Sequence, residues 1–319
     1  MFKAVKPHRL KAYLSKIDRI FPEMSEANDI TAEDITTYYD ESYIGYSIFH
    51  SWSGAIHMAI SRNGKFSKND YFRQAEEAAI LAKRHSTSGV LLELGCGRGF
   101  NIGYLGHQLP EWTCIGVDFS ERHITDATER YKGLTNVRFN TDDFHELNSI
   151  DDGSCDFVLC VESICHALDF DKVAATIARK IKPGGMLMIF DGFRNSQETV
   201  DADLDRATTL VEAAMSVPKS PEISAFRECF EKVGFKLSEE EDLSAAVMPN
   251  LIRLSDLAKG FFKFPALTKT LLRVFPRGLL RNAVAGILLP ITVESGLHSY
   301  RRLVFSFGAR NKQSARKRD

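Results

Sequence analysis

An apolar run that ends in an acidic residue and three alternating glycines constrains the fold of this chain more than any other segment. It reads Val90-Leu-Leu-Glu-Leu-Gly-Cys-Gly-Arg-Gly-Phe100. The run predicts a buried strand. The glycines predict a tight turn, because residues without a Cβ atom can adopt left-handed dihedral angles and let a ligand lie against the peptide groups. A helix that begins near Arg98 would present free backbone N–H groups to that ligand. The segment therefore predicts a nucleotide-binding turn.

The spacing of the glycines separates two kinds of nucleotide site. A nicotinamide dinucleotide site requires a third glycine three residues after the second, and that position is Phe100. Gly-x-Gly-x-Gly, with an acid two residues ahead of it, instead resembles the first motif of class I S-adenosylmethionine (SAM) methyltransferases. The resemblance implies that the acid and the loop contact SAM, through Glu93, Gly95, Cys96, Gly97 and Gly99.

A second short strand, Cys114-Ile-Gly-Val-Asp118, ends in a carboxylate. It lies about twenty residues beyond the glycines, the separation expected of a ribose-binding acid in a βαβ unit. We therefore predict that Asp118 accepts hydrogen bonds from both ribose hydroxyls and that Phe119 lies along the adenine face. The alternative is a helix-capping Asp followed by an ordinary core Phe.

A third strand, 136–140, leads into the acidic loop Thr141-Asp-Asp-Phe-His-Glu-Leu147. In the family that the chain resembles, an Asp of this loop accepts the adenine amino group and the next backbone N–H reaches the ring. When the loop is aligned on Leu147, Asp143 corresponds to that Asp and Phe144 to its neighbour. Asp142 is the competing choice for the Asp. A solvated acidic turn is the simpler alternative for both carboxylates.

The segment Cys155-Asp-Phe-Val-Leu-Cys-Val-Glu-Ser-Ile-Cys-His-Ala167 is an apolar strand followed by polar residues. Ligands bind at the carboxyl ends of strands in open α/β sheets. The string resembles the sterol and tocopherol methyltransferases, particularly the Glu-x-x-Cys-His-Ala pattern of the sterol side-chain enzymes, and the resemblance adds Val161 to the cofactor contacts.

Glu162 and His166 are the leading catalytic candidates, with His57 behind them. Glu162 could instead bond nearby backbone, and His166 could merely orient a loop. Cyclopropane-forming relatives carry Glu-His in this loop, where this chain has Cys165 in place of the Glu. The departure favours simple methylation.

The turn and strand Lys180-Ile-Lys-Pro-Gly-Gly-Met-Leu-Met-Ile-Phe-Asp191 complete five elements in the order of the superfamily. We predict an α/β fold, a Rossmann-like, mostly parallel sheet with an antiparallel edge strand at 300–307. Two further helices are expected at 169–181 and 222–233, and a strand at 235–238. The predicted divisions are a helical cap at 1–88, the SAM-binding core at 89–244, a helical insertion at 245–298, the last strand at 299–309 and a basic disordered tail at 310–319.

The amino-terminal cap carries aromatic residues that resemble the region before the first motif in the sterol and tocopherol enzymes. The resemblance implies that Tyr39 hydrogen-bonds the methionine end of SAM. An aromatic substrate pocket would be formed by Tyr43, Tyr46, Phe49 and Trp52. Aromatic side chains at helical spacing also form ordinary cores, which is the alternative for this set.

The insertion interleaves Phe and Leu with Lys and Arg, most clearly in 259–281. This basic amphipathic character suits a lid over an apolar substrate, a peripheral membrane helix, or a subdomain that packs its apolar face on the core. The uncharged run 282–293 is well short of the ~20 residues of a transmembrane helix.

Composition restricts the partners. The balance of 41 basic and 42 acidic residues gives no reason to expect nucleic acid. The six cysteines form no CxxC pair, so we predict no metal site and reduced thiols in the cytoplasm, with peripheral membrane contact as an addition. The amino terminus lacks the apolar run of a signal peptide.

These observations predict a SAM-dependent methyltransferase that acts on a small lipophilic acceptor such as a terpenoid, sterol-like or quinone-like molecule. C-methylation is favoured, and O- or N-methylation stays open, as does assembly into a homo-oligomer. The alternatives are a SAM-binding module without catalysis and, less favoured because of Phe100, an NAD-dependent oxidoreductase.

Overall fold

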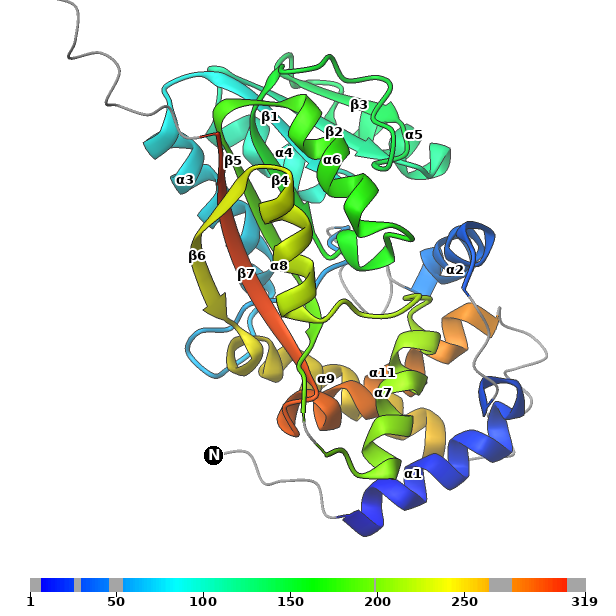
Figure 1. The fold of residues 1–319 in the computed structure, drawn as a ribbon. Helices are drawn as coiled ribbons and strands as arrows, with labels where there is room; N and C mark the ends of the chain where they lie inside the picture. Colours follow the sequence, from blue (N-terminus) through cyan, green and yellow to red (C-terminus); the bar gives the residue numbers. More distant parts are fainter. Residues whose placement is uncertain (1–6, 26–29, 46–53, 198, 264–276, 309–319) are drawn as a thin grey trace, which may run out of the picture.

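A seven-stranded sheet forms the centre of the molecule (Figure 1). The computed structural model describes residues 7–25, 30–45, 54–197, 199–263 and 277–308. The strands, in sheet order, are β3 (Val137–Thr141), β2 (Trp112–Asp118), β1 (Gly89–Leu94), β4 (Cys155–Val161), β5 (Ile181–Arg194), β7 (His298–Phe307) and β6 (Phe235–Asp242). The first five are parallel, and β7 is antiparallel to both of its neighbours. The predicted strands and the antiparallel direction of the last one are confirmed. Because β7 lies between β5 and β6, the outermost strand on this side is β6.

Two apolar cores cover the two faces of the sheet. Alternate residues of β4 serve different cores, with Phe157 and Leu159 in one and Val158 and Cys160 in the other. This alternation follows from the two-residue period of a strand, and burial of both faces explains why the central strands are continuously apolar. The flanking helices are α3 (Arg73–His85), α4 (Phe100–Gln108) and α5 (Glu121–Tyr131) on the first face, and α6 (Phe170–Lys180) and α8 (Ile223–Lys232) on the second.

A separate helical layer lies beside the sheet domain (Figure 1). Its helices are α1 (Pro7–Ile20), α2 (Ala32–Gly45), α7 (Ala202–Ala214), α9 (Ser244–Lys263) and α11 (Arg277–Glu294). All except α2 contribute to an apolar core around Ile17, Val211 and Val284. The predicted helical character of the cap and of the insertion is confirmed. The described chain also contains short 3-10 helices at η1 (Pro22–Ser25), η3 (Lys68–Phe72) and η4 (Ile164–His166).

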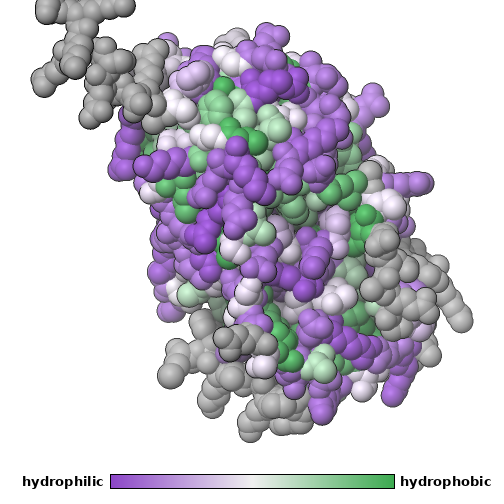
Figure 2. All heavy atoms as spheres, in the orientation of Figure 1, coloured by the Kyte–Doolittle hydropathy of each residue, from purple (hydrophilic) through white to green (hydrophobic). Residues whose placement is uncertain are grey.

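The insertion packs its apolar face inside this layer. Phe262 of α9 is buried, and Phe261 packs on the same core. Within the described part of the chain, no helix combines the length and apolar character needed to cross a membrane. Figure 2 shows a largely hydrophilic face with small apolar areas. Residues 264–276, at the centre of the predicted membrane segment, and the predicted tail at 310–319 lie outside the described residues.

Candidate active site

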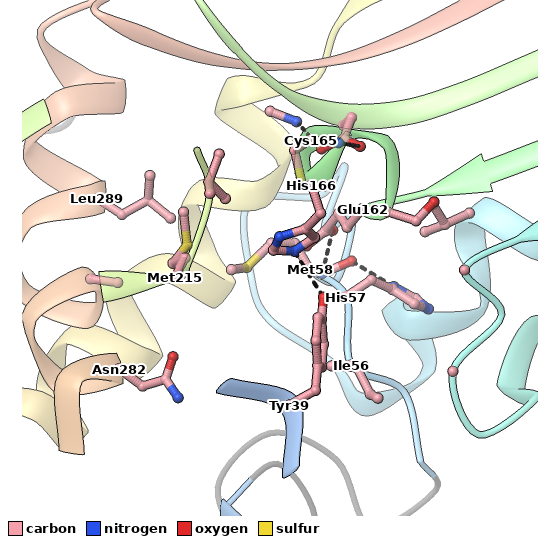
Figure 3. Close-up of a pocket in the computed structure, with 18 of the residues that line it drawn as sticks. Tyr39, Ile56, His57, Met58, Glu162, Cys165, His166, Met215, Asn282 and Leu289 are labelled. Atoms are coloured by element: carbon pink, nitrogen blue, oxygen red, sulfur yellow. Dashed lines mark hydrogen bonds between the residues drawn. The ribbon is translucent and has the colours of Figure 1, made fainter. Parts of the chain in front are cut away.

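A cavity of about 530 Å³ lies between the carboxyl ends of the parallel strands and the helical layer. Twelve of the predicted site residues line it: Tyr39, His57, Glu93, Gly95, Cys96, Gly97, Asp118, Phe119, Phe144, Val161, Glu162 and His166. Figure 3 shows the labelled Glu162, His57, Met58 and His166 on one side and Leu289, Met215 and Asn282 on the other. The fold thus brings together residues from the cap, the core and the insertion.

The glycine loop has the strained backbone that its sequence predicts. Gly95, Gly97 and Gly99 have φ angles of 66°, 50° and 75°, all in the left-handed region. A Cβ atom on Gly95 would lie 2.4 Å from the Cβ of Ser163, so the loop also requires glycine for space. Helix α4 begins at Phe100 rather than near Arg98, because Gly99 takes the left-handed conformation as its N-cap.

The carboxylate of Asp118 is fixed beside this loop at the end of β2. Its Oδ2 accepts the backbone N–H of Gly97 at 2.9 Å, and its Oδ1 accepts that of Ser120 at 2.9 Å. The side chain is buried and lines the cavity. Each carboxylate oxygen has two acceptor sites, so Asp118 can accept ribose hydroxyls in addition to these two backbone donors.

The two acidic candidates of the following loop do not line the cavity. Asp142 Oδ2 accepts the backbone N–H of Ser149 at 2.7 Å, and Asp143 Oδ1 accepts that of His145 at 2.8 Å. Both carboxylates therefore bond within their own loop, and Phe144 is the residue of this loop that reaches the cavity. Gly99 likewise lies outside the lining and shapes the turn from its N-cap position.

Glu93 is buried next to the glycine loop and has a hydrogen-bond partner that the sequence analysis did not predict. Asn101, on the first turn of α4, donates its Nδ2–H to Glu93 Oε1 at 2.7 Å. Burial raises the pKa of Glu93 to about 8. Its Oε2 has no hydrogen-bond partner among the described residues, so this edge of the cavity holds an acceptor that a bound ligand can satisfy.

Glu162 has an unusual backbone at the end of β4. Its φ of 48° lies in the left-handed region, and its backbone N–H donates to the carbonyl of Phe190 at 2.8 Å. Such strain costs of order 1–3 kcal/mol and is concentrated at functional sites. The side-chain Oε1 accepts the N–H of Met58 at 2.6 Å and the hydroxyl of Tyr300 at 2.8 Å. Burial raises the pKa of Glu162 to about 8.

Both candidate histidines are held as neutral rings. Burial lowers the pKa of His57 and that of His166 to about 4. His166 Nδ1 donates to the carbonyl of Ser216 at 3.1 Å, so its Nε2 accepts the hydroxyl of Tyr39 at 2.9 Å. His57 Nδ1 donates to the carbonyl of Met58 at 3.2 Å, which leaves Nε2 as an acceptor. Neutral rings orient neighbours and accept protons only weakly at pH 7.

The opposite wall of the cavity is apolar and comes from helices that are remote in sequence. Its members include Leu251, Leu254 and Phe261 of α9 and Leu280, Ala283 and Leu289 of α11. In α2, the hydroxyl of Tyr38 donates to Asn282 Oδ1 at 2.7 Å, which ties the cap to the insertion. The predicted aromatic pocket cannot be placed, since Tyr46, Phe49, Trp52 and the side chain of Tyr43 lie outside the described residues.

Sequence patterns did not reveal the roles of four residues that support the site. Tyr300 of β7 donates to Glu162, and Gln74 of α3 donates to the Tyr300 hydroxyl; only long-range packing brings these residues together. Asn101 was detectable in principle, because it follows the glycine loop on the first turn of a predicted helix. Asp191, at the end of the predicted fifth strand, is buried in the lining, and burial raises its pKa to about 6.

Known proteins share this domain. Residues 92–189 match the model of the methyltransferase domain family. A 24-methylenesterol C-methyltransferase of Arabidopsis thaliana is 26% identical over 227 residues, covering 67% of this chain and 60% of that protein. A sterol 24-C-methyltransferase of Kluyveromyces lactis is 23% identical over 210 residues, covering 61% and 53%. The structure of a cyclopropane synthase from Mycobacterium tuberculosis superimposes with a TM-score of 0.72 at 14% identity, covering 88% of this chain and 100% of that one.

The domain match and the fold agree. Residues 92–189 form a methyltransferase domain, the fold is the Rossmann-like fold of class I SAM-dependent methyltransferases, and the sequence is similar to those of sterol methyltransferases. It spans about 53% to 60% of the length of these two curated relatives.

Proposed function

We propose that this protein transfers the methyl group of SAM to a carbon atom of a small, uncharged, lipophilic acceptor. One observation carries the proposal. A single cavity joins the glycine loop and Asp118 of the sheet to the apolar wall formed by α9 and α11. A polar cofactor and an apolar acceptor can therefore meet in one enclosed space, as an in-line displacement on a methyl group requires.

The sheet side fits SAM by its donors, acceptors and shape. The glycine loop leaves room for a ligand against the backbone, and the orphaned Oε2 of Glu93 can accept a hydrogen bond from the methionine ammonium. Asp118 would hold the ribose, with Phe119 and Phe144 beside the adenine. Tyr39 would close the methionine end from α2. When bound, SAM supplies the electrophilic methyl group.

The helical side supports an acceptor without a strongly anionic group. Among the described lining residues, Arg98 is the one lysine or arginine, and it is paired with Asp126 at 3.5 Å. The apolar side chains of α9 and α11 offer no ion pair to a phosphate or carboxylate. A neutral terpenoid, sterol-like or quinone-like molecule suits this wall, and its burial contributes about 25 cal/mol per Å² of apolar surface.

Glu162 is our candidate proton acceptor. Attack by an acceptor double bond forms the new C–CH₃ bond, while the electrons of the breaking C–S bond remain on sulfur. The carbocation left on the adjacent carbon is neutralised when a neighbouring C–H bond gives its electrons to a new double bond and its proton to Glu162. Glu162 and Asp191 would stabilise the positive charge before that step, and His57 and His166 would position the surrounding groups.

Calorimetry and mass spectrometry test the proposal in sequence. The protein should bind SAM and S-adenosylhomocysteine, and incubation with SAM and a panel of neutral isoprenoids should yield products heavier by one methylene unit. SAM binding without transfer to any acceptor would favour the non-catalytic module. Tighter binding of NADH than of S-adenosylhomocysteine would favour an oxidoreductase.

Contact with a membrane surface is a separate part of the proposal. The basic and apolar segment 259–281 continues from α9, which already lines the acceptor wall. A cytoplasmic enzyme that meets its acceptor at a bilayer would gain from such a contact. Flotation with anionic vesicles should recover the protein, and replacing Lys259, Lys263, Lys269 and Arg273 by Gln should reduce that recovery. Equal recovery of both proteins would contradict the proposal.

A further inference from the structure

The two oxygen atoms of Glu162 are held differently. Both of its side-chain hydrogen bonds, from the Met58 N–H and the Tyr300 hydroxyl, end on Oε1. Within the described chain, no hydrogen bond reaches Oε2, and Glu162 lines the cavity. A carboxyl group whose one oxygen accepts two donors carries its titrating proton on the other oxygen.

Gln74 sets the direction of the Tyr300 hydrogen bond. Its Nε2 lies 2.6 Å from the carbonyl oxygen of Met58 and 3.3 Å from the hydroxyl oxygen of Tyr300. A carbonyl can only accept, so the amide group that faces it must be the NH₂. The same NH₂ donates to the Tyr300 oxygen, and the phenolic hydrogen is therefore directed to Glu162.

The surrounding backbone keeps Tyr300 in place. Its N–H donates to Ser244 Oγ at 3.0 Å, and its carbonyl accepts the N–H of Leu243 at 2.8 Å. The ring is buried, as is Gln74. Strand β7 pairs Tyr300 with Gly192, which lies next to Asp191 in β5. The hydroxyl thus reaches Glu162 from a rigid strand rather than from a loop.

We propose that Tyr300, oriented by Gln74, is a positioning residue that holds Oε1 of Glu162 and reserves Oε2 for proton exchange with the acceptor. The inference rests on the proposed role of Glu162 in methyl transfer. Loss of the Tyr300 donor removes one of the two hydrogen bonds that stabilise the carboxylate. The pH at which Glu162 ionises should then rise, and the carboxyl group should lose its fixed orientation.

The pH dependence involves a defined set of neighbours. The titratable groups that face Glu162 in the described structure are Asp191 of β5, Cys165 of η4, Tyr71 of η3 and Tyr300 of β7. Tyr71 is a buried tyrosine whose hydroxyl accepts Asn250 Nδ2 at 3.4 Å. Tyr71→Phe is therefore a matched control, since it removes a buried hydroxyl near the site without removing a hydrogen bond to Glu162.

Turnover measurements on the full chain test the positioning role. Tyr300→Phe should keep the Kd for SAM within about twofold and lower kcat about ten- to hundredfold, the size expected for one hydrogen bond to a charged group. The acid limb of the kcat profile should move up by roughly one pH unit. In a Glu162→Gln background, Tyr300→Phe should add little further loss, because it acts through the missing carboxylate. Additive losses, or an unmoved acid limb, would overturn the proposal.

A direct titration separates this proposal from the proposed reaction. Carbon-13 carboxyl NMR of Glu-labelled protein, with the Glu162 signal assigned by Glu162→Gln, follows its ionisation without turnover. The signal should titrate at higher pH in Tyr300→Phe and at the wild-type pH in Tyr71→Phe. If the titration shifts but no acceptor is methylated, the proposed reaction is wrong and the positioning of the carboxyl group stands. If the titration does not shift, Tyr300 has no such role.

Discussion

The two walls of the cavity are built in different ways. The sheet wall uses backbone turns and carboxylates within about thirty residues of one another along the chain, with Gly97 and Asp118 joined by a 2.9 Å hydrogen bond. The helical wall uses side chains of α9 and α11, drawn from a different part of the chain. Glu162 stands between them and is held by Tyr300 and Met58. A local motif can specify the first wall, whereas the second exists only after the helices have packed.

The largest expected effect lies at the junction of the walls. Glu162→Gln should lower kcat about 10²- to 10⁴-fold, the range of general base catalysis, because an amide cannot accept the proton. The Kd for SAM should change little. Methyl transfer and calorimetry measure the two quantities. Glu146→Gln, at an exposed ion pair with Lys172, is the matched control. Equal losses in SAM binding and turnover would place Glu162 in the cofactor wall.

The pH dependence of turnover should report the same carboxyl group. Burial raises the pKa of Glu162 to about 8, and the base acts only when ionised. We expect kcat to fall about fiftyfold from pH 8 to pH 6, because the ionised fraction of the carboxyl group falls from about one half to about one hundredth. His57 and His166, with pKa values lowered to about 4, stay neutral in this window. A kcat profile that is flat from pH 6 to 8 would contradict the role of Glu162 as base.

The cofactor wall should show a smaller but specific effect. Asp118→Ala removes a carboxylate that accepts two backbone N–H groups and, in our proposal, the ribose hydroxyls. SAM binding should weaken by about 1–3 kcal/mol, measured by calorimetry. Asp152→Ala, at an exposed carboxylate that pairs with Lys180, should leave SAM binding unchanged. Normal SAM affinity in Asp118→Ala would remove Asp118 from the cofactor site.

The smallest effect is expected on the helical wall. Leu289→Trp places a larger ring in the apolar part of the cavity and should raise the KM for a long acceptor by about tenfold, roughly the 1–3 kcal/mol of an overpacked apolar site. The Kd for SAM should not change. Ile80→Trp, at a half-exposed position of α3, is the control. A loss of SAM binding in Leu289→Trp would show that the two walls are not independent.

Prediction from sequence succeeded where neighbours in the chain are neighbours in space. The left-handed glycines, the carboxylate at the end of β2 and the polar residues after β4 follow from patterns a few residues long. Sequence patterns did not predict the hydrogen bonds of Asp142 and Asp143. Whether these carboxylates face a ligand or bond their own loop depends on where Ser149 and His145 lie. Tyr300 carried no local signal at all.

By itself, the sequence determined a strand, a glycine turn and an acid-ended second strand, since dihedral freedom and two-residue periodicity are local properties. These identify the fold class and the cofactor side of the site. Only the tertiary structure decided which helices form the acceptor wall and which groups hold Glu162. Packing of α9 and α11 and the pairing of β7 with β5 join residues that are far apart in the chain, and no local pattern encodes those distances.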